Sequence, residues 1–249
     1  MSGQGWGRRA WEVCQSCWEG LWDFVFPPRC WLCQQYTGTD WGLCEACQKQ
    51  LRDLSDRACW RCGRTVGPYA DLTRGCDRCR TEHYPFRSVK RLGRYEGVLR
   101  DAVLQIKHAA YEGLAVALGR FLGYLLTHTE VPFDVIVPVP LHWWRQWRRG
   151  YNQAEALAEG IGEITGKRVL SKVLLRIRPT SSQTWQSPTE RQPNIKGAFR
   201  AQFRGHSVPR SVLLVDDVMT TGSTLTEAAR TLRNAGVREI HVAILARTE

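Results

Sequence analysis

Three apolar runs along the chain have the composition of strands that are buried on both faces. They lie at 134–138, 212–216 and 240–246, and each is rich in valine, isoleucine or leucine. Uninterrupted runs of this kind are typical of parallel sheets that helices cover on both sides. Because apolar residues recur at helical spacing between them, the pattern predicts an α/β fold with a doubly wound parallel sheet.

The remaining periodic segments complete this predicted fold. The stretch 88–97 predicts a further strand with its turn, and 168–177 predicts one strand or two short ones. A glycine at position 236 is expected to stop the helix that precedes the last strand. The predicted helices lie at 97–109, 111–128, 152–165 and from 225 onward.

The stretch 212–225 carries the most specific chemistry. Its strand ends in two acids, and a small-residue turn then leads into a helix. The first N–H groups of a helix have no partner within it and carry the positive end of its dipole, so this turn predicts an anion site. The acids are Asp216 and Asp217, and the residues of the turn are Thr220, Thr221, Gly222, Ser223 and Thr224.

Carboxylates beside a phosphate cradle would repel the phosphate itself. Asp216 and Asp217 are therefore expected to accept hydrogen bonds from sugar hydroxyls or to hold Mg²⁺. The acid pair and the anion site together predict a phosphorylated sugar as ligand. The structural alternative is a solvated acid pair with Thr220 or Thr221 as an ordinary helix cap. A Walker nucleotide site is not expected, because the sequence contains no GxxxxGK[ST] motif.

The loop after the strand at 134–138 interleaves arginines with tryptophans. This composition fits a groove for single-stranded nucleic acid, a pyrophosphate site, or a solvated helix with the tryptophans packed beneath it. The nucleic-acid candidates are Trp143, Trp144, Arg145, Trp147 and Arg148. The pyrophosphate candidates are Lys107, at the end of a predicted helix, and Val139, Pro140 and Arg149.

All ten cysteines occur in CxxC pairs. Two such pairs can close a tetrahedron of thiolates around zinc, and the absence of an export signal favours zinc over disulfides. Sequential and interleaved pairing both remain open, and Cys14 and Cys17 have no second pair to join. The predicted ligands of two structural zinc ions are Cys30, Cys33, Cys44, Cys47, Cys59, Cys62, Cys76 and Cys79.

Composition adds a charge argument. The 249 residues carry a formal charge of +11, which indicates a polyanionic partner such as nucleic acid, a phosphate-rich substrate or an acidic membrane surface. Residues 1–27 predict an amphipathic helix that docks on the body of the protein or meets a partner or membrane surface. Acids interrupt its apolar face and no run reaches the length of a membrane span, so a cytoplasmic location is expected.

Two resemblances extend this reading. The motif VLLVDDVMTTGST at 212–224 resembles the phosphoribosyl pyrophosphate site of type I phosphoribosyltransferases. This implies that Asp216 and Asp217 bind ribose in the catalytic centre, that 220–224 bind the 5-phosphate, and that Mg²⁺ accompanies the pyrophosphate. VPVPLH at 137–142, RRGYNQAE at 148–155 and IKGAF at 195–199 resemble the competence-associated ComF family, in which a zinc domain precedes a phosphoribosyltransferase-like domain.

The ComF resemblance implies a role in handling incoming single-stranded DNA, with DNA-uptake or recombination proteins as partners. The expected organisation is an amphipathic segment at 1–27, a double zinc ribbon at 28–84 and a phosphoribosyltransferase-like domain at 85–249. Residues 178–196 are polar and contain prolines, so they predict either a lid over the reaction centre, with Gln183, Arg191 and Asn194 as candidates, or a disordered linker.

Three functional classes remain open at this stage. The first is a phosphoribosyltransferase with an unidentified acceptor, and the second is a DNA-handling protein whose phosphoribosyl site is regulatory. The third is a zinc-built interaction module with an inactive site. The acceptor is not predicted, because the zinc ribbons occupy the place where enzymes of the superfamily usually build a base-recognising hood.

Overall fold

A five-stranded parallel sheet forms the centre of the molecule. The computed structural model describes residues 27–37, 41–54, 57–129, 131–141, 149–178 and 195–249. The strand order is β1-β7-β6-β2-β3, and every neighbouring pair is parallel. The strands are β1 (Ser88–Arg94), β2 (Val135–Pro138), β3 (Arg168–Val169), β6 (Ser211–Met219) and β7 (Glu239–Arg247).

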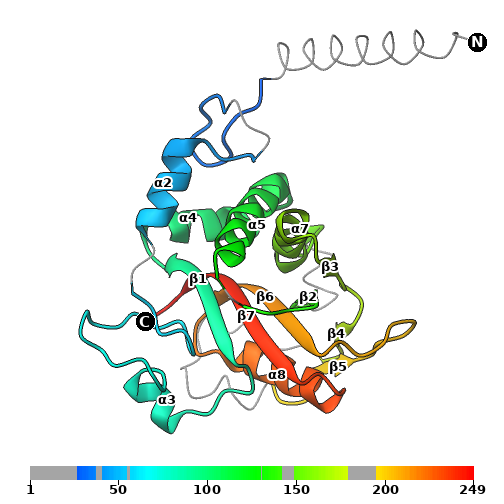
Figure 1. Cartoon of the computed structure of the whole chain (residues 1–249). Coiled ribbons are helices and arrows are strands. Elements are labelled where there is room, and N and C mark those ends of the chain that lie inside the picture. The colour runs from blue at the N-terminus through cyan, green and yellow to red at the C-terminus, as the bar shows by residue number, and fades with distance from the viewer. Residues whose placement is uncertain (1–26, 38–40, 55–56, 130, 142–148, 179–194) are drawn as a thin grey trace, which may run out of the picture.

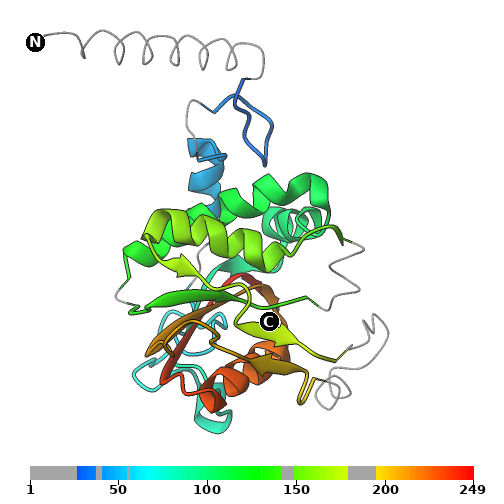
Figure 2. The same ribbon diagram turned by 90° about the vertical axis from the view of Figure 1, so that its right-hand side faces the viewer.

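Helices cover both faces of this sheet, as the apolar runs predict (Figures 1 and 2). Side chains of β6 alternate between two cores: Leu213 and Val215 face one layer of helices, whereas Val212 and Leu214 face the other side. The first layer consists of α4 (Gly97–Gln105), α5 (Glu112–Thr127) and α7 (Gln153–Thr165). The opposite face is covered by α8 (Ser223–Asn234).

A small antiparallel pair of strands forms a second sheet, next to the β3 edge of the main one. It consists of β4 (Leu174–Arg176) and β5 (Phe199–Ala201), with Leu175 opposite Arg200. The two short strands β3 and β4 confirm one of the two alternatives for 168–177. The sequence analysis assigned no element to β5. The proposed lid candidates Gln183, Arg191 and Asn194 lie outside the described residues.

The cysteine-rich region lies along the β1 side of the sheet and contains two short helices, α2 (Glu45–Asp53) and α3 (Asp77–Thr81). Leu43 and Leu51 of its first half are buried in the same core as α4 and α5. Its second half is held to β1 by a hydrogen bond of 2.8 Å from the N–H of Val89 to the carbonyl of Trp60. Each half is therefore packed against the α/β region.

Helix α4 is shorter than the apolar pattern predicts. It ends at Gln105, and a turn of 3-10 helix, η1 (Ala109–Tyr111), separates it from α5. Lys107 therefore lies in the connection after the helix and not within its last turn. Among the described helices, none combines the length and apolar character needed to cross a membrane. The predicted helix at 1–27 falls almost wholly outside the described residues.

Candidate functional site

Asp216 and Asp217 lie in β6, at the carboxyl edge of the sheet. The N–H of Asp217 donates to Oδ1 of Asp216 at 2.9 Å, and the N–H of Val218 donates to Oδ1 of Asp217 at 2.8 Å. The side chain of Asp217 is buried, with 9% of its surface exposed. Ligands of open α/β sheets bind at this edge. The two carboxylates thus stand where a bound molecule would meet them.

The acid pair carries unbalanced negative charge. Burial, followed by repulsion from Asp217, raises the pKa of Asp216 well above its ordinary value. The positive charge of Arg176, on β4, acts in the opposite direction and favours the ionised form. Sequence reasoning did not identify Arg176, because it is 40 positions from Asp216 in a stretch with no motif. A cation or a set of hydroxyl donors would relieve the repulsion between these acids.

The turn after β6 leaves the amino terminus of α8 available to a ligand. Gly222 is the cap residue, with a left-handed φ of 80°, and no side chain of the described residues caps the helix. Thr221 Oγ1 and Ser223 Oγ lie 2.5 Å apart and form one hydroxyl pair. The cap residue is thus Gly222 and neither Thr220 nor Thr221, although Thr221 Oγ1 accepts a long hydrogen bond of 3.4 Å from the N–H of Ser223. The free N–H groups and the two hydroxyls suit an oxyanion such as phosphate.

A chain of side-chain hydrogen bonds crosses from α7 to this edge. Gln153 is buried, and its Nε2 donates to Oδ2 of Asp217 at 3.3 Å. Nη1 of Arg149 donates to Oε1 of Gln153 at 3.1 Å. The structure thereby links Arg149, a predicted pyrophosphate residue, to the acid pair. Gln153 lies within the RRGYNQAE motif, but its spacing in the sequence gave no indication of the partner 64 residues later.

The predicted pyrophosphate residues converge on the same edge. Asn152 caps α7, and its Nδ2 donates to the carbonyl of Val139 at 3.2 Å, which fixes the chain just before Pro140. The hydroxyl of Tyr151 donates to the carbonyl of Ile106, next to Lys107. Burial raises the pKa of Tyr151 to about 12, so this phenol stays protonated and remains a donor at neutral pH.

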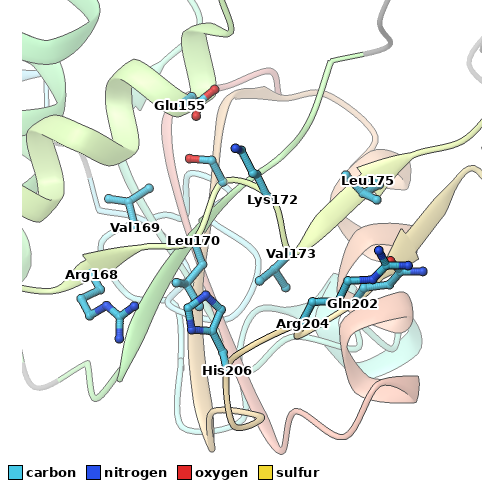
Figure 3. A pocket seen from close by; sticks show the side chains of 11 residues that line it. Glu155, Arg168, Val169, Leu170, Lys172, Val173, Leu175, Gln202, Arg204 and His206 are labelled. Atoms are coloured by element: carbon cyan, nitrogen blue, oxygen red, sulfur yellow. The ribbon is translucent and has the colours of Figure 1, made fainter.

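A basic groove opens beside this region, between β3 and the small sheet (Figure 3). Its volume is about 700 Å³, and Glu155 is its only acidic lining residue among those described. The described stretches 166–178 and 195–210 around it contain no aspartate or glutamate. They contain nine cations, which explains much of the net charge of +11: Lys167, Arg168, Lys172, Arg176, Arg178, Lys196, Arg200, Arg204 and Arg210.

The loop residues predicted to contact nucleic acid, Trp143, Trp144, Arg145, Trp147 and Arg148, lie outside the described part of the chain. The basic groove is a separate feature that the sequence analysis did not recognise. The sequence nevertheless indicates such a basic surface, because it contains a long stretch without acidic residues. Arg168, Lys172 and Arg204 line the groove and are exposed.

The eight predicted zinc ligands form two separate clusters. Within each one, the four sulfur atoms lie within 4.8 Å of one another. The first cluster joins Cys30 and Cys33 to Cys44 and Cys47, and the second joins Cys59 and Cys62 to Cys76 and Cys79. The pairing is therefore sequential, and in each cluster a helix begins directly after the third ligand, α2 after Cys44 and α3 after Cys76.

The sulfur geometry fits zinc and not disulfides. Sulfur atoms of Cys33 and Cys44 are 3.6 Å apart, as are those of Cys62 and Cys76, and all eight cysteines are free. A tetrahedron with zinc–sulfur bonds of about 2.3 Å has edges of roughly 3.8 Å. Four thiolates per cluster leave no open position for water, which is the arrangement of a structural site.

Comparisons with known proteins agree with both parts of the chain. Residues 21–80 match the double zinc ribbon domain, and residues 148–249 match the phosphoribosyl transferase domain. A solved structure titled as the allosteric regulatory enzyme of purine biosynthesis is 25% identical over 53% of this chain, with a TM-score of 0.37. The chain spans about a quarter of that structure, since the match covers 26% of it, and the likeness carries no argument about activity.

Curated relatives match over most of the chain. Competence protein F of Haemophilus influenzae is 36% identical, over 83% of this chain and 90% of its own. The DNA utilization protein YhgH of Escherichia coli K12 is 32% identical, over 89% and 98% respectively. Competence protein ComFC of Bacillus subtilis is 28% identical, over 78% and 79%. With its two cysteine clusters and its phosphoribosyltransferase-type sheet, the chain belongs to the competence protein F (ComF) family.

Proposed function

We propose that this protein binds phosphoribosyl pyrophosphate together with Mg²⁺ at the carboxyl edge of the sheet. The observation that carries the proposal is the end of β6, where two acids precede an uncapped helix amino terminus. The hydroxyls of Thr221 and Ser223 and the N–H groups of α8 would bind the 5-phosphate. Asp216 and Asp217 would accept hydrogen bonds from the ribose hydroxyls.

The pyrophosphate would lie on the α7 side of this site. Arg149 supplies a guanidinium suited to bidentate phosphate binding, and its bond to Gln153 holds it toward the acid pair. Lys107 directly follows Ile106, whose carbonyl accepts the hydrogen bond from Tyr151. Lys107 would therefore bring a second cation to the pyrophosphate from the end of α4. Bound Mg²⁺ would neutralise pyrophosphate charge, with carboxylate oxygens of the acid pair as the hard ligands available on this edge.

Phosphorus NMR tests this assignment, because the 5-phosphate and the pyrophosphate give separate signals. We expect both signals to broaden when the zinc-loaded protein and Mg²⁺ are added. Thr221→Ala with Ser223→Ala should abolish the broadening of the 5-phosphate signal, whereas Thr226→Ala, one turn into α8, should leave it unchanged. Equal broadening in all three proteins would place the phosphate elsewhere. Release of pyrophosphate on addition of an acceptor would identify the protein as a transferase.

We further propose that the protein handles single-stranded DNA in the cytoplasm during DNA uptake. Relatives named competence protein F and DNA utilization protein support this role. The specific observation that favours DNA is the basic surface around the groove, where Glu155 is the single acidic lining residue among those described. Exposed apolar side chains of Leu175 and Ile177 lie on this surface, with 40% and 45% of their areas accessible. Sites that bind single strands combine a positively charged groove with side chains, usually aromatic, on which the bases pack. Leu175 and Ile177 would supply apolar contacts of this kind.

Fluorescence anisotropy with a labelled oligothymidylate at several salt concentrations tests the DNA proposal. Reversing three groove charges, Arg168→Glu, Lys172→Glu and Arg204→Glu, should weaken binding by more than about tenfold and lower the salt slope by roughly 2. The control reverses three exposed cations in the cysteine-rich region, Lys49, Arg52 and Arg74. A larger loss in the control than in the groove variant would contradict the proposal and indicate the zinc ribbons.

A further inference from the structure

The side chain of Arg247, the last residue of β7, is buried, and its guanidinium has no hydrogen-bond partner among the described residues. It has 0% exposure and is the largest fully buried side chain among the described residues. All three of its guanidinium nitrogens lack a hydrogen-bond partner in the described part of the chain. An unpaired buried charge costs several kcal/mol, so a protein retains one only where another charge compensates it.

The second cysteine cluster lies next to the side chain of Arg247. A Cβ atom built on Gly63, directly after Cys62, would lie 3.6 Å from Cδ of Arg247. Burial lowers the pKa of Arg247, and the charge of Cys62 is the strongest of the opposing influences. Arg64, whose Nε is also buried without a partner, lies in the same environment.

Glu249 is the nearby carboxylate, but other groups already bind it. It accepts hydrogen bonds from the N–H of Thr65 at 3.1 Å and from its hydroxyl at 2.6 Å. Arg91 forms an ion pair with it at 3.3 Å. Glu249 therefore forms its ion pair with Arg91, which leaves the cysteine cluster, among the described residues, as the anionic group without a paired cation beside Arg247.

Zinc makes this cluster a strong anion. Four thiolates contribute four negative charges and Zn²⁺ returns two, so a closed tetrathiolate site carries a net charge of about −2. Cys59, Cys62 and Cys79 are buried, so water screens this charge poorly. In the first cluster Cys30 and Cys47 are also buried, but Cys33 is exposed to solvent, whereas no cysteine of the second cluster is exposed. The two clusters thus differ in their need for a compensating cation.

We propose that Arg247 is the counter-charge of the second zinc–thiolate cluster, so that the zinc affinity of this ribbon depends on a residue of the α/β sheet. The arrangement also joins the zinc to the phosphoribosyl strand. Arg247 pairs with Met219 at the end of β6, and the N–H of Thr248 donates to the carbonyl of Met219 at 3.1 Å. The charge of Arg247 thus adds to the hydrogen bond between Val89 and Trp60 that joins the second ribbon to β1.

Cysteine alkylation mapped by mass spectrometry tests this proposal in the full zinc-loaded chain, because it reports on each cluster separately. Groups that support metal ligands contribute about 10- to 100-fold to metal affinity. In the presence of a competing chelator, Arg247→Met should speed alkylation of the second cluster's cysteines by about tenfold or more. Cysteines of the first cluster should react at the wild-type rate, and they serve as the internal control.

Two further variants separate charge from packing. Arg247→Lys keeps the charge and should protect the second cluster far better than Arg247→Met, including in the case where the methionine variant does not fold. Arg91→Met removes a buried arginine at the same interface and should not expose the second cluster selectively. The proposal is overturned by equal loss of protection in the lysine and methionine variants, by equal loss in Arg91→Met, or by wild-type protection in Arg247→Met.

Discussion

Gln153 and Asp217 form a hydrogen bond of 3.3 Å that joins the first turn of α7 to the end of β6. Gln153 also accepts from Arg149 at 3.1 Å, so a single buried amide contacts both the acid side and the cationic side of the proposed site. This bond orients a carboxylate and a guanidinium relative to each other before any ligand arrives. Such preorganisation lowers the cost of ordering side chains on binding.

Replacing Gln153 tests the importance of that link. Gln153→Leu fills a similar volume but removes both side-chain hydrogen bonds. Asp217 then lacks this donor, and Arg149 lacks its acceptor. We expect affinity for phosphoribosyl pyrophosphate to fall about tenfold, equivalent to roughly 1.4 kcal/mol. Titration calorimetry measures the change. An unchanged dissociation constant in a folded Gln153→Leu protein would show that the bond has no role in binding.

The acid pair should reduce the stability of the free protein. Burial and Asp217 raise the pKa of Asp216, so the folded state favours its neutral form and loses stability as the pH rises above the unfolded value of about 3.9. Asp216→Asn stays neutral and should be more stable than wild type at pH 7, by about 0.5–2 kcal/mol. Urea unfolding of the zinc-loaded proteins should show this advantage shrinking toward pH 5. A less stable variant throughout that range would contradict the charge argument.

The turn that would bind phosphate should not tolerate a side chain at Gly222. This residue has φ of 80°, and a Cβ atom there would lie 2.5 Å from Cε of Met219. Gly222→Ala should cost about 1–3 kcal/mol and abolish phosphoribosyl pyrophosphate binding. Gly166→Ala is the matched control, because its φ is 68° and its Cβ would meet no atom within 4 Å. It should lose stability but keep its affinity.

Zinc removal should destabilise the whole chain and not only the cysteine-rich region. Leu43 lies between ligands of the first cluster and Leu51 follows its last ligand. Both side chains are buried in the core that α4 and α5 form. Releasing both would cost roughly 3–6 kcal/mol of apolar burial, equivalent to about 10 °C or more in melting temperature. Thermal unfolding with a chelator and a reductant, followed through helix content, measures this. An unshifted transition would show that the two regions fold independently.

The parts of this structure that the sequence predicts are those whose signal is local. The apolar run, the acid pair and the helix at 212–225 occupy one continuous stretch, so strand, turn and helix follow from a single pattern. The zinc ligands are equally local, because CxxC spacing directs two thiolates to one side. Sequential pairing became apparent only from the positions of the sulfur atoms, since the spacing alone allows both arrangements.

Contacts between segments that are far apart in the sequence could not be predicted from local patterns. Arg176 influences Asp216, and Gln153 contacts Asp217, only because the sheet order brings these segments together. Strand β5 has three residues, too few for an alternation of apolar and polar positions to distinguish it from a loop. Arg247 looks in the sequence like the solvated end of a strand. Its burial follows from the second ribbon packing over β7, which no local pattern reveals.

Calorimetric titration of phosphoribosyl pyrophosphate with Mg²⁺ is the most direct test of the central claim, that the end of β6 is a phosphoribosyl site. It compares the zinc-loaded wild type with the double variant Asp216→Asn, Asp217→Asn. We predict saturable binding in the wild type and its loss in the variant, whose fold is checked by circular dichroism. No binding to the folded, zinc-loaded wild type, or equal binding to both proteins, would contradict the account.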